Sequence, residues 1–338
     1  MSTLAEWISP EKKYCLFFGA GFSKWAINLP TAAELFDYNI KLWGIRERKK
    51  LEELKKIKTA WDRENPSGIP EKFIRLMIES SKKEKQLVTW YIARRLADPF
   101  IAESSIMTTY DGRKCQQRRV MMFDDTRRFK IAGIIRAKIF INSLLGPSLQ
   151  GIITTNYDLL VEYALGTKGF NYGKKMEMLH GQWAMPIRRL RNGPVFLKGE
   201  LPLIKLHGSI SKTEKGYCTD GRGGITGRAL IIPPTQNKEI MDFVSTEWKN
   251  AEKILKKSSI IIFFGFAFNQ YDLNILDLLK KTKSWIKKVI LINRNPQVKQ
   301  YAQNIWPSAE IILIHPDDLD EDLLQMLDNS ENISSRYR

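Results

Sequence analysis

The sequence predicts an α/β protein with a doubly wound, mostly parallel, Rossmann-like sheet and an inserted helical module, without a zinc ribbon. Short, uninterrupted apolar runs alternate with segments of helical spacing, which is the pattern of strands covered on both faces by helices. Several of these runs end directly in glycine or polar residues, as strands do where the carboxyl edge of a sheet binds a ligand. At 338 residues the chain has room for one large domain or two.

Composition limits the class of protein. A hydrophobic content of 43% excludes wholesale disorder. The cysteines are Cys15, Cys115 and Cys218, without a CxxC pair, which rules out a four-cysteine zinc site and argues against a disulfide framework. The longest apolar run, residues 260–268, is shorter than the roughly 20 residues that span a bilayer. Residues 1–10 lack the pattern of a secretory signal, so we expect a cytoplasmic protein without membrane contact.

Basic residues outnumber acidic ones, with 54 Lys and Arg against 37 Asp and Glu, for a net charge of +17. Such an excess attracts polyanions electrostatically, and this attraction does not depend on nucleotide sequence. It suits a nucleic acid, a negatively charged dinucleotide or an acidic partner subunit, and charge alone does not choose among them.

The first strand is predicted over Tyr14–Phe18, and it runs into the glycine turn GAGFS at residues 19–23. Gly19 and Gly21 allow close backbone approach to a phosphate at the start of the following helix. The alternative is a tight turn between strand and helix. The third glycine of the dinucleotide fingerprint is missing, as is a ribose-binding acid about 20 residues later, so this is not a standard dehydrogenase site.

Residues 32–146 are predicted to be a mainly helical insertion between the first and second strands. Thr31 and Glu34 have the spacing of a capping box at its start. Helical spacing covers residues 35–61, 71–97 and 126–145, and residues 99–111 are predicted to be a loop. Residues 113–130 carry the densest basic run of the chain, for which a solvated face is favoured over a nucleic-acid groove.

The stretch from Gly151 to Asp158 combines a short apolar run with hydroxyl, amide and carboxylate side chains. The apolar part is typical of the end of a buried parallel strand, and the polar part of the loop that leaves it. Asn156 and Asp158 are therefore candidate ligand-binding residues. The alternative is that one of them caps a helix beginning near Leu159.

Other predicted strands end in similar groups. Residues 203–206 precede His207, whose side chain exchanges protons near neutral pH. Apolar runs over 229–232, 260–264, 289–292 and 311–314 are predicted to be strands, and residues 239–257 and 271–280 helices. In a parallel sheet the strand ends at residues 19–23, 154–158, 207–209, 265–267 and 293 share one edge, where those near the switch point can line one crevice.

Together these motifs resemble the sirtuin superfamily. GAGFS (19–23) is similar to its phosphate-binding GAGxS, TTNYD (154–158) to its TQNxD, KLHGS (205–209) to its catalytic LHG, and LINRN (291–295) to the strand end whose Asn contacts the adenosine ribose. The chain lacks the zinc-ribbon cysteines and the Asp-Phe-Arg that follows the first loop in deacylases. It is closer to a zinc-less bacterial branch found in antiphage defence systems, through NLPT (28–31), PPT (233–235) with Lys238, Trp248, and Gly265-Phe266-Ala267 with Asp272.

This resemblance implies an NAD+ glycohydrolase that forms nicotinamide and ADP-ribose, and so depletes NAD in abortive infection. NAD is then the substrate, and no zinc is required. The implied catalytic residues are Asn156 and His207. The implied NAD-binding residues are Gly19, Ala20, Gly21, Ser23, Thr155, Asp158, Gly265, Ala267 and Asn293. Ala267 stands where the branch has Ser, and it lacks that hydroxyl.

The resemblance also implies an organisation and partners. Residues 1–31 and 147–330 are expected to form the sirtuin-like domain, 32–146 the insertion, and 331–338 a flexible tail. A homo-oligomer is expected, with activation by a partner ATPase of the HerA helicase type or another sensor. The alternatives are an NAD-dependent protein deacylase or ADP-ribosyltransferase, and a nucleic-acid-binding or nuclease subunit of a defence complex, which the basic insertion allows.

Overall fold

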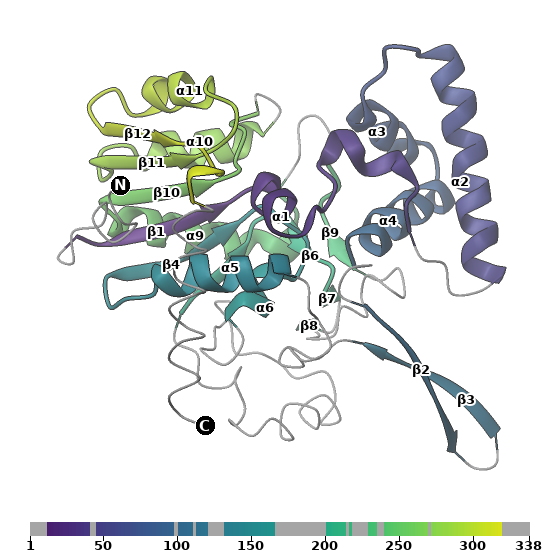
Figure 1. Cartoon of the computed structure of the whole chain (residues 1–338). Helices are drawn as coiled ribbons and strands as arrows, with labels where there is room; N and C mark the ends of the chain where they lie inside the picture. Colours follow the sequence, from purple (N-terminus) through teal and green to yellow (C-terminus); the bar gives the residue numbers. More distant parts are fainter. Residues whose placement is uncertain are drawn as a thin grey trace.

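A computed structural model describes residues 12–40, 45–97, 101–110, 113–120, 132–165, 201–213, 216–217, 229–234, 240–269 and 272–319. It contains a six-stranded sheet in the order β12-β11-β10-β1-β4-β5, with every neighbouring pair parallel (Figure 1). The strands are β1 (Tyr14–Phe18), β4 (Leu149–Thr154), β5 (Leu203–Lys205), β10 (Ile260–Phe264), β11 (Lys288–Ile292) and β12 (Glu310–Ile314). The predicted parallel sheet is confirmed.

The strand order places a switch point beside β1. From β1 the chain proceeds to β4 and β5 on one side, and later to β10, β11 and β12 on the other. The chain after β1 and the chain after β10 therefore continue to opposite faces of the sheet, and the crevice outside the carboxyl ends of these two strands is where an open α/β sheet binds its ligand.

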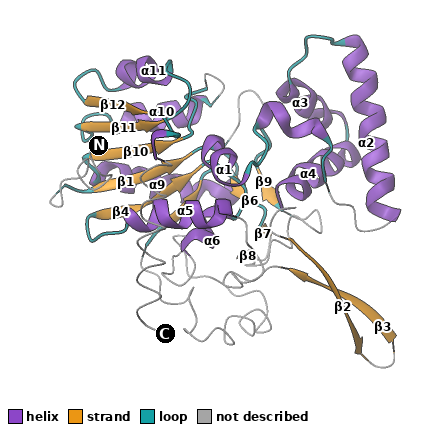
Figure 2. Ribbon diagram, in the orientation of Figure 1, coloured by secondary structure: helices purple, strands orange, loops and turns teal. Residues whose placement is uncertain are grey.

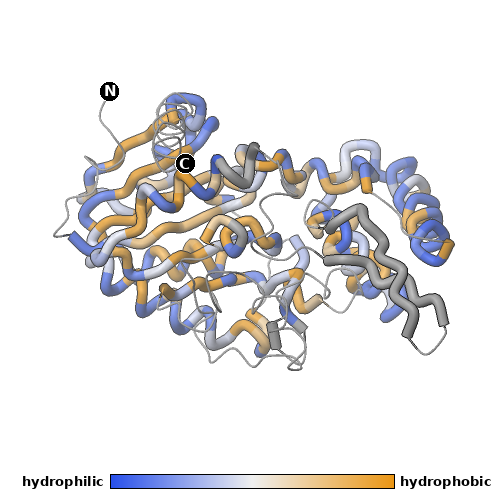
Figure 3. Tube along the Cα trace, turned by 60° about the horizontal axis from the view of Figure 1, so that its bottom comes forward, coloured by the Kyte–Doolittle hydropathy of each residue, from blue (hydrophilic) through white to orange (hydrophobic). Residues whose placement is uncertain are grey.

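Helices cover both faces of this sheet (Figure 2). Leu16 and Phe18 of β1 join the core under α1 (Ala20–Ile27), α5 (Ala132–Ser143) and α6 (Leu160–Leu165). Cys15 and Phe17 join the opposite core under α9 (Ser245–Lys257), α10 (Leu273–Lys281) and α11 (Val298–Ile305). Because successive strand residues point to opposite faces, β1 needs apolar residues throughout, and all five are buried. Figure 3 shows hydrophobic residues concentrated along these strands.

The helical block consists of η2 (Ala32–Asp37), α2 (Ile45–Glu64), α3 (Pro70–Ser80) and α4 (Lys82–Ala97). The predicted capping box of Thr31 and Glu34 is present, and Thr31 N donates to Glu34 Oε2 at 3.0 Å. Within the block, Tyr91 Oη donates to the Leu35 carbonyl at 2.6 Å. Its apolar side chains are continuous with the core on the α1 face of the sheet.

The predicted loop over residues 99–111 is wrong where the structure describes it. β2 (Ile101–Tyr110) pairs antiparallel with β3 (Arg113–Val120), and this hairpin extends away from the sheet (Figure 1). The missed signal is Asp111-Gly112, a dipeptide typical of tight hairpin turns, directly after a run that contains Ile, Thr and Tyr. The insertion is therefore not wholly helical, and α5 packs on α1 and α6 beside the sheet.

Short antiparallel pairs lie beside the main sheet. β6 (Gly208–Ser209) pairs with β9 (Leu230–Ile231), and β7 (Lys212–Thr213) with β8 (Gly216–Tyr217). The strand predicted over 229–232 is thus present, but outside the parallel sheet. A helix with the length and apolarity to cross a membrane does not occur among the described residues.

Candidate functional site at the carboxyl edge of the sheet

A cavity of about 520 Å³ opens at the carboxyl edge, around the ends of β1 and β10. This volume lies within the range of about 300–1,000 Å³ that is typical of small-molecule sites. The sequence-predicted residues that line it are Ala20, Gly21, Ser23, Thr155, Asn156, Asp158, His207, Gly265, Ala267 and Asn293. Gly19 is outside this lining. The fold therefore brings together side chains that are far apart in the sequence.

The two glycine loops pack backbone against backbone. Gly21 N donates to the Gly265 carbonyl at 3.0 Å, and Gly19 N to the Phe264 carbonyl at 2.9 Å. A Cβ at Gly19 would lie 2.5 Å from Gly265 O, and one at Gly21 would lie 2.6 Å from Gly265 Cα. These glycines are thus required by loop packing, and the Gly21 N–H is already bonded within the protein.

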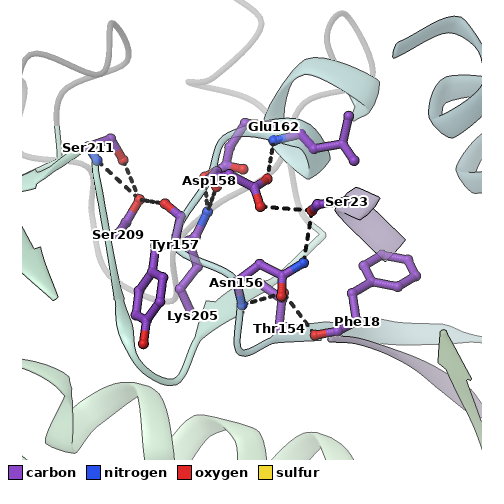
Figure 4. A network of polar contacts seen from close by, with 11 residues as sticks. Phe18, Ser23, Thr154, Asn156, Tyr157, Asp158, Glu162, Lys205, Ser209 and Ser211 are labelled. Atoms are coloured by element: carbon purple, nitrogen blue, oxygen red, sulfur yellow. Dashed lines mark hydrogen bonds and ion pairs between the residues drawn. The ribbon is translucent and has the colours of Figure 1, made fainter. Parts of the chain in front are cut away.

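Asn156, Ser23 and Asp158 form a buried chain of hydrogen bonds (Figure 4). Asn156 Nδ2 donates to the Gly19 carbonyl at 2.9 Å and to Ser23 Oγ at 3.0 Å. Ser23 Oγ in turn donates to Asp158 Oδ2 at 2.7 Å. Since the Gly19 carbonyl only accepts, it fixes the orientation of the amide. Asn156 Oδ1 accepts no hydrogen bond from the part of the chain that the structure describes.

Asp158 serves two structures at once. Its Oδ1 accepts from Leu160 N at 2.9 Å at the start of α6, while its Oδ2 accepts from Ser23. Both alternatives raised by the sequence, a helix cap and a site residue, are therefore compatible with one carboxylate. Thr154 Oγ1 supports the same loop, because it donates to the Phe18 carbonyl at 3.0 Å and accepts from Asn156 N at 3.0 Å.

His207 is 3% exposed and lines the cavity from the loop after β5. Its ring centroid lies 6.2 Å from that of Tyr157. The two residues are also linked through Ile232, whose carbonyl accepts from Tyr157 Oη at 2.6 Å and whose N–H donates to the His207 carbonyl at 2.8 Å. Burial, reinforced by the Asp272 carboxylate, raises the pKa of the Tyr157 hydroxyl, which keeps its proton for this bond.

The loop after β11 is joined to the loop after β10. Asn293 Nδ2 donates to the Phe266 carbonyl at 2.9 Å, and Asn293 Oδ1 accepts from Asn295 N at 3.0 Å. Asp272, at the N-cap of α10, also lines the cavity. Trp248 lies behind the site, where its Nε1 donates to the Leu206 carbonyl at 3.0 Å. Thr235 and Lys238 of the PPT motif lie outside the described residues.

Several residues of the site carried no sequence signal. The helical block contributes Leu35, Glu71 and Leu96 to the cavity wall. Below the wall, Lys205 Nζ contacts Glu162 Oε1 at 2.8 Å, with both side chains buried. Burial raises the pKa of the Glu162 carboxyl, and the adjacent Lys205 ammonium opposes that rise. Partners 43 residues apart have no local spacing that would reveal them.

A cluster of three or more His, Cys, Asp or Glu residues able to hold a metal ion is absent from the described ranges.

Comparison with known proteins finds a likeness to one family over part of the chain. Residues 150–314 match the model of the SIR2-like domain. The sequence has no match among curated proteins. Among solved structures, a Sir2 homologue in complex with NAD is 15% identical, with 95% of this chain and 91% of that chain covered and a TM-score of 0.44. A mutant Sir2 homologue with 2′-O-acetyl-ADP-ribose is 13% identical, with 98% of each chain covered and a TM-score of 0.45.

The matched residues begin within β4, ahead of Asn156, and end at the last residue of β12. They include the loops that carry Asn156, Asp158, His207 and Asn293. The SIR2-like match therefore covers this part of the site, whereas β1 and the glycine loop that follows it lie outside the matched residues.

Proposed function

We propose that this chain hydrolyses NAD+ to nicotinamide and ADP-ribose in the cavity at the ends of β1 and β10. One observation carries the proposal: Asn156, held through its amide nitrogen by Gly19 and Ser23, lines the same cavity as His207. An acceptor oxygen and an imidazole in one cavity supply the groups that water attack on a glycosidic carbon requires. The motif resemblance supports NAD as the substrate.

The reaction breaks the bond between the ribose C1′ and the pyridinium nitrogen. Nicotinamide leaves as a neutral molecule and needs no acid, and the ribose ring passes through an oxocarbenium-like state. A water molecule forms the new C1′–O bond and releases one proton, for which His207 is the general base. Asn156 Oδ1 accepts a hydrogen bond from that water or from a ribose hydroxyl.

The remaining predicted residues hold the two ends of NAD. Ala20 and Gly21 face the cavity at the start of α1, where a pyrophosphate is favoured by the helix dipole. Gly19 and Ser23 act mainly by fixing Asn156, since their polar groups already bond within the protein. Gly265, Ala267 and Asn293 form the adenosine side, and Thr155 and Asp158 the ribose side.

The biological setting that we propose is NAD depletion during phage infection. It is supported by the motif resemblance, as are a homo-oligomer and activation by a HerA-type ATPase or another sensor. Nicotinamide release by the purified chain, alone and with the product of a neighbouring gene, tests this setting. Turnover that rises with the partner supports it, and turnover unaffected by the partner contradicts the proposed activation.

The catalytic assignment is tested with Asn156→Ala and His207→Ala. Loss of a positioned acid–base group typically costs about 10²–10⁴-fold in rate, and we expect nicotinamide release to fall by that much in each variant. Matched controls are His315→Ala and Asn65→Ala, whose side chains are exposed and lie outside the cavity lining. Both controls should retain wild-type turnover.

Two outcomes would contradict the proposal. A folded Asn156→Ala or His207→Ala variant with wild-type turnover would remove the assignment of these residues. NAD loss that occurs only when an acetylated peptide is added would instead identify a protein deacylase, and transfer of labelled ADP-ribose to protein would identify an ADP-ribosyltransferase.

A further inference from the structure

A buried ion pair lies beside the loop that carries Asn156 and Asp158 (Figure 4). Lys205 at the end of β5 and Glu162 in α6 are 1% and 0% exposed, with Nζ and Oε1 2.8 Å apart. Replacing such a pair with apolar residues of similar volume is often neutral or even stabilising, because desolvation offsets the attraction of the charges. Stability alone therefore does not account for two buried charges at this place.

The Lys205 ammonium also holds the loop that follows β4. Besides Glu162, it donates to the main-chain carbonyl of Asp158. The Asp158 carboxylate is held from the other side by Ser23 Oγ and Leu160 N. The same Ser23 oxygen accepts from Asn156. A continuous chain of directional contacts thus leads from the buried pair to the amide that lines the cavity.

Lys205 stands two residues before His207. In the sheet it pairs with Thr154, and Leu206 N donates to the Thr154 carbonyl at 2.9 Å. Main-chain hydrogen bonds therefore join β4 and β5. The Lys205 side chain adds a second link, between β5, which leads to His207, and the loop after β4, which carries Asn156.

We propose that Lys205 and Glu162 are positioning residues that set the placement of Asn156 relative to His207. Glu162 holds the ammonium so that another of its donors reaches the Asp158 carbonyl, since an ammonium has three donors. An apolar pair fills the same volume but lacks these directional contacts. The inference rests on the proposed NAD hydrolysis and adds residues that do not touch the substrate.

The chain offers a matched control pair. Lys212 contacts Glu247 and donates to the Phe243 carbonyl, with the two charged side chains 9% and 2% exposed. Like Lys205 and Glu162, this control pair consists of an ammonium that contacts a carboxylate and also donates to a main-chain carbonyl. Lys212, Glu247 and Phe243 are not among the described residues that line the cavity.

The test compares Lys205→Met/Glu162→Leu with Lys212→Met/Glu247→Leu in the full chain. Thermal unfolding checks the fold, and nicotinamide release gives kcat and KM for NAD. Displacement of a reacting group by about 1 Å can cost about 100-fold, so we expect kcat of the first double variant to fall by about that factor with KM within a few-fold. The control pair should keep kcat within about two-fold, because it leaves that geometry intact.

Lys205→Met/Glu162→Gln gives a second test, because it keeps a neutral polar group at position 162 and should show the same loss of kcat. Wild-type kcat in either folded Lys205 variant would overturn the proposal. Failure of both Lys205 variants to fold while the control pair folds would assign the pair to stability and would also overturn it. Absence of turnover in the wild-type chain, assayed together with the activating partner, would instead count against the proposed hydrolysis.

Discussion

At the scale of single residues, the polar groups of the site are shared between structure and the proposed chemistry. Asp158 divides its two carboxylate oxygens between the start of α6 and Ser23. The local sequence suggested either use of Asp158, but it could not show that both occur, because Ser23 lies 135 residues away. Long-range partners of this kind are decided by topology and have no signature in the spacing of neighbouring residues.

Tyr157 gives a prediction at this scale. Tyr157→Phe removes the hydroxyl that donates to the Ile232 carbonyl and leaves the ring in place. We expect a loss of about 1 kcal/mol in the free energy of unfolding, measured by urea denaturation, since this is the usual net value of one hydrogen bond. Tyr301→Phe is the control, because Tyr301 is 44% exposed, and its change should stay within about 0.5 kcal/mol. Equal losses in the two variants would contradict the structural role of Tyr157.

Cys15 gives a prediction about pH. Complete burial raises the pKa of its thiol from 9.0 to about 12. The folded state therefore holds the proton more tightly, and any stability gained from this thiol is present below pH 9 and is lost as pH rises towards 12. We expect Cys15 to resist iodoacetamide at pH 8–9 in the native protein, by peptide mass spectrometry, and to react in guanidinium. Native labelling at the unfolded rate would show that the thiol is not buried.

At the scale of elements, the two glycine loops behave as one unit. Gly265 has φ +65°, and a Cβ there would lie 2.3 Å from Phe22 N and 2.4 Å from Gly21 Cα. Gly265→Ala should cost at least about 1–3 kcal/mol in the free energy of unfolding, from backbone strain and the clash with α1.

Gly146→Ala is the matched control for this prediction, because among the described residues the added methyl would approach Tyr14 Oη alone, at 3.3 Å. It should change the free energy of unfolding by about 0.5 kcal/mol or less. Denaturant unfolding of both variants provides the measurement. A fully stable Gly265→Ala variant would mean that the loops after β1 and β10 do not pack as described.

The elements also show what the sequence could predict. Tyr14–Phe18 and Ile260–Phe264 are uninterrupted apolar runs. Such runs are typical of central parallel strands, because these strands are buried on both faces of the sheet. Residues 101–110 contain Glu, Ser and Thr as well as apolar residues, so their pairing depends on the partner strand more than on their own pattern. Helical spacing predicted one segment over residues 71–97, whereas the structure has two helices, α3 and α4. The sequence does not show the break between them, because it consists of one extended residue, Ser81.

At the scale of the whole molecule, the net charge of the chain and the charged residues that line the cavity bear on different binding properties. The net charge of +17 is a property of the entire chain, whereas the cavity combines basic Lys24 and Arg294 with acidic Glu71, Asp158 and Asp272. We expect the DNA-binding constant, measured by fluorescence anisotropy, to be similar for duplexes of unrelated sequence. Its logarithm should fall linearly with the logarithm of the salt concentration. Sequence-selective binding that persists at high salt would contradict a purely electrostatic origin.

The central claim is that the cavity at the ends of β1 and β10 cleaves NAD through Asn156 and His207. The most direct measurement is proton NMR of NAD incubated with the wild-type chain and with Asn156→Ala, each with the activating partner and without peptide substrate. We predict nicotinamide and ADP-ribose in equal amounts from the wild-type chain, and a rate about 10²–10⁴-fold lower from the variant. Unchanged NAD with the wild-type chain, or equal rates from the two folded proteins, would contradict the claim.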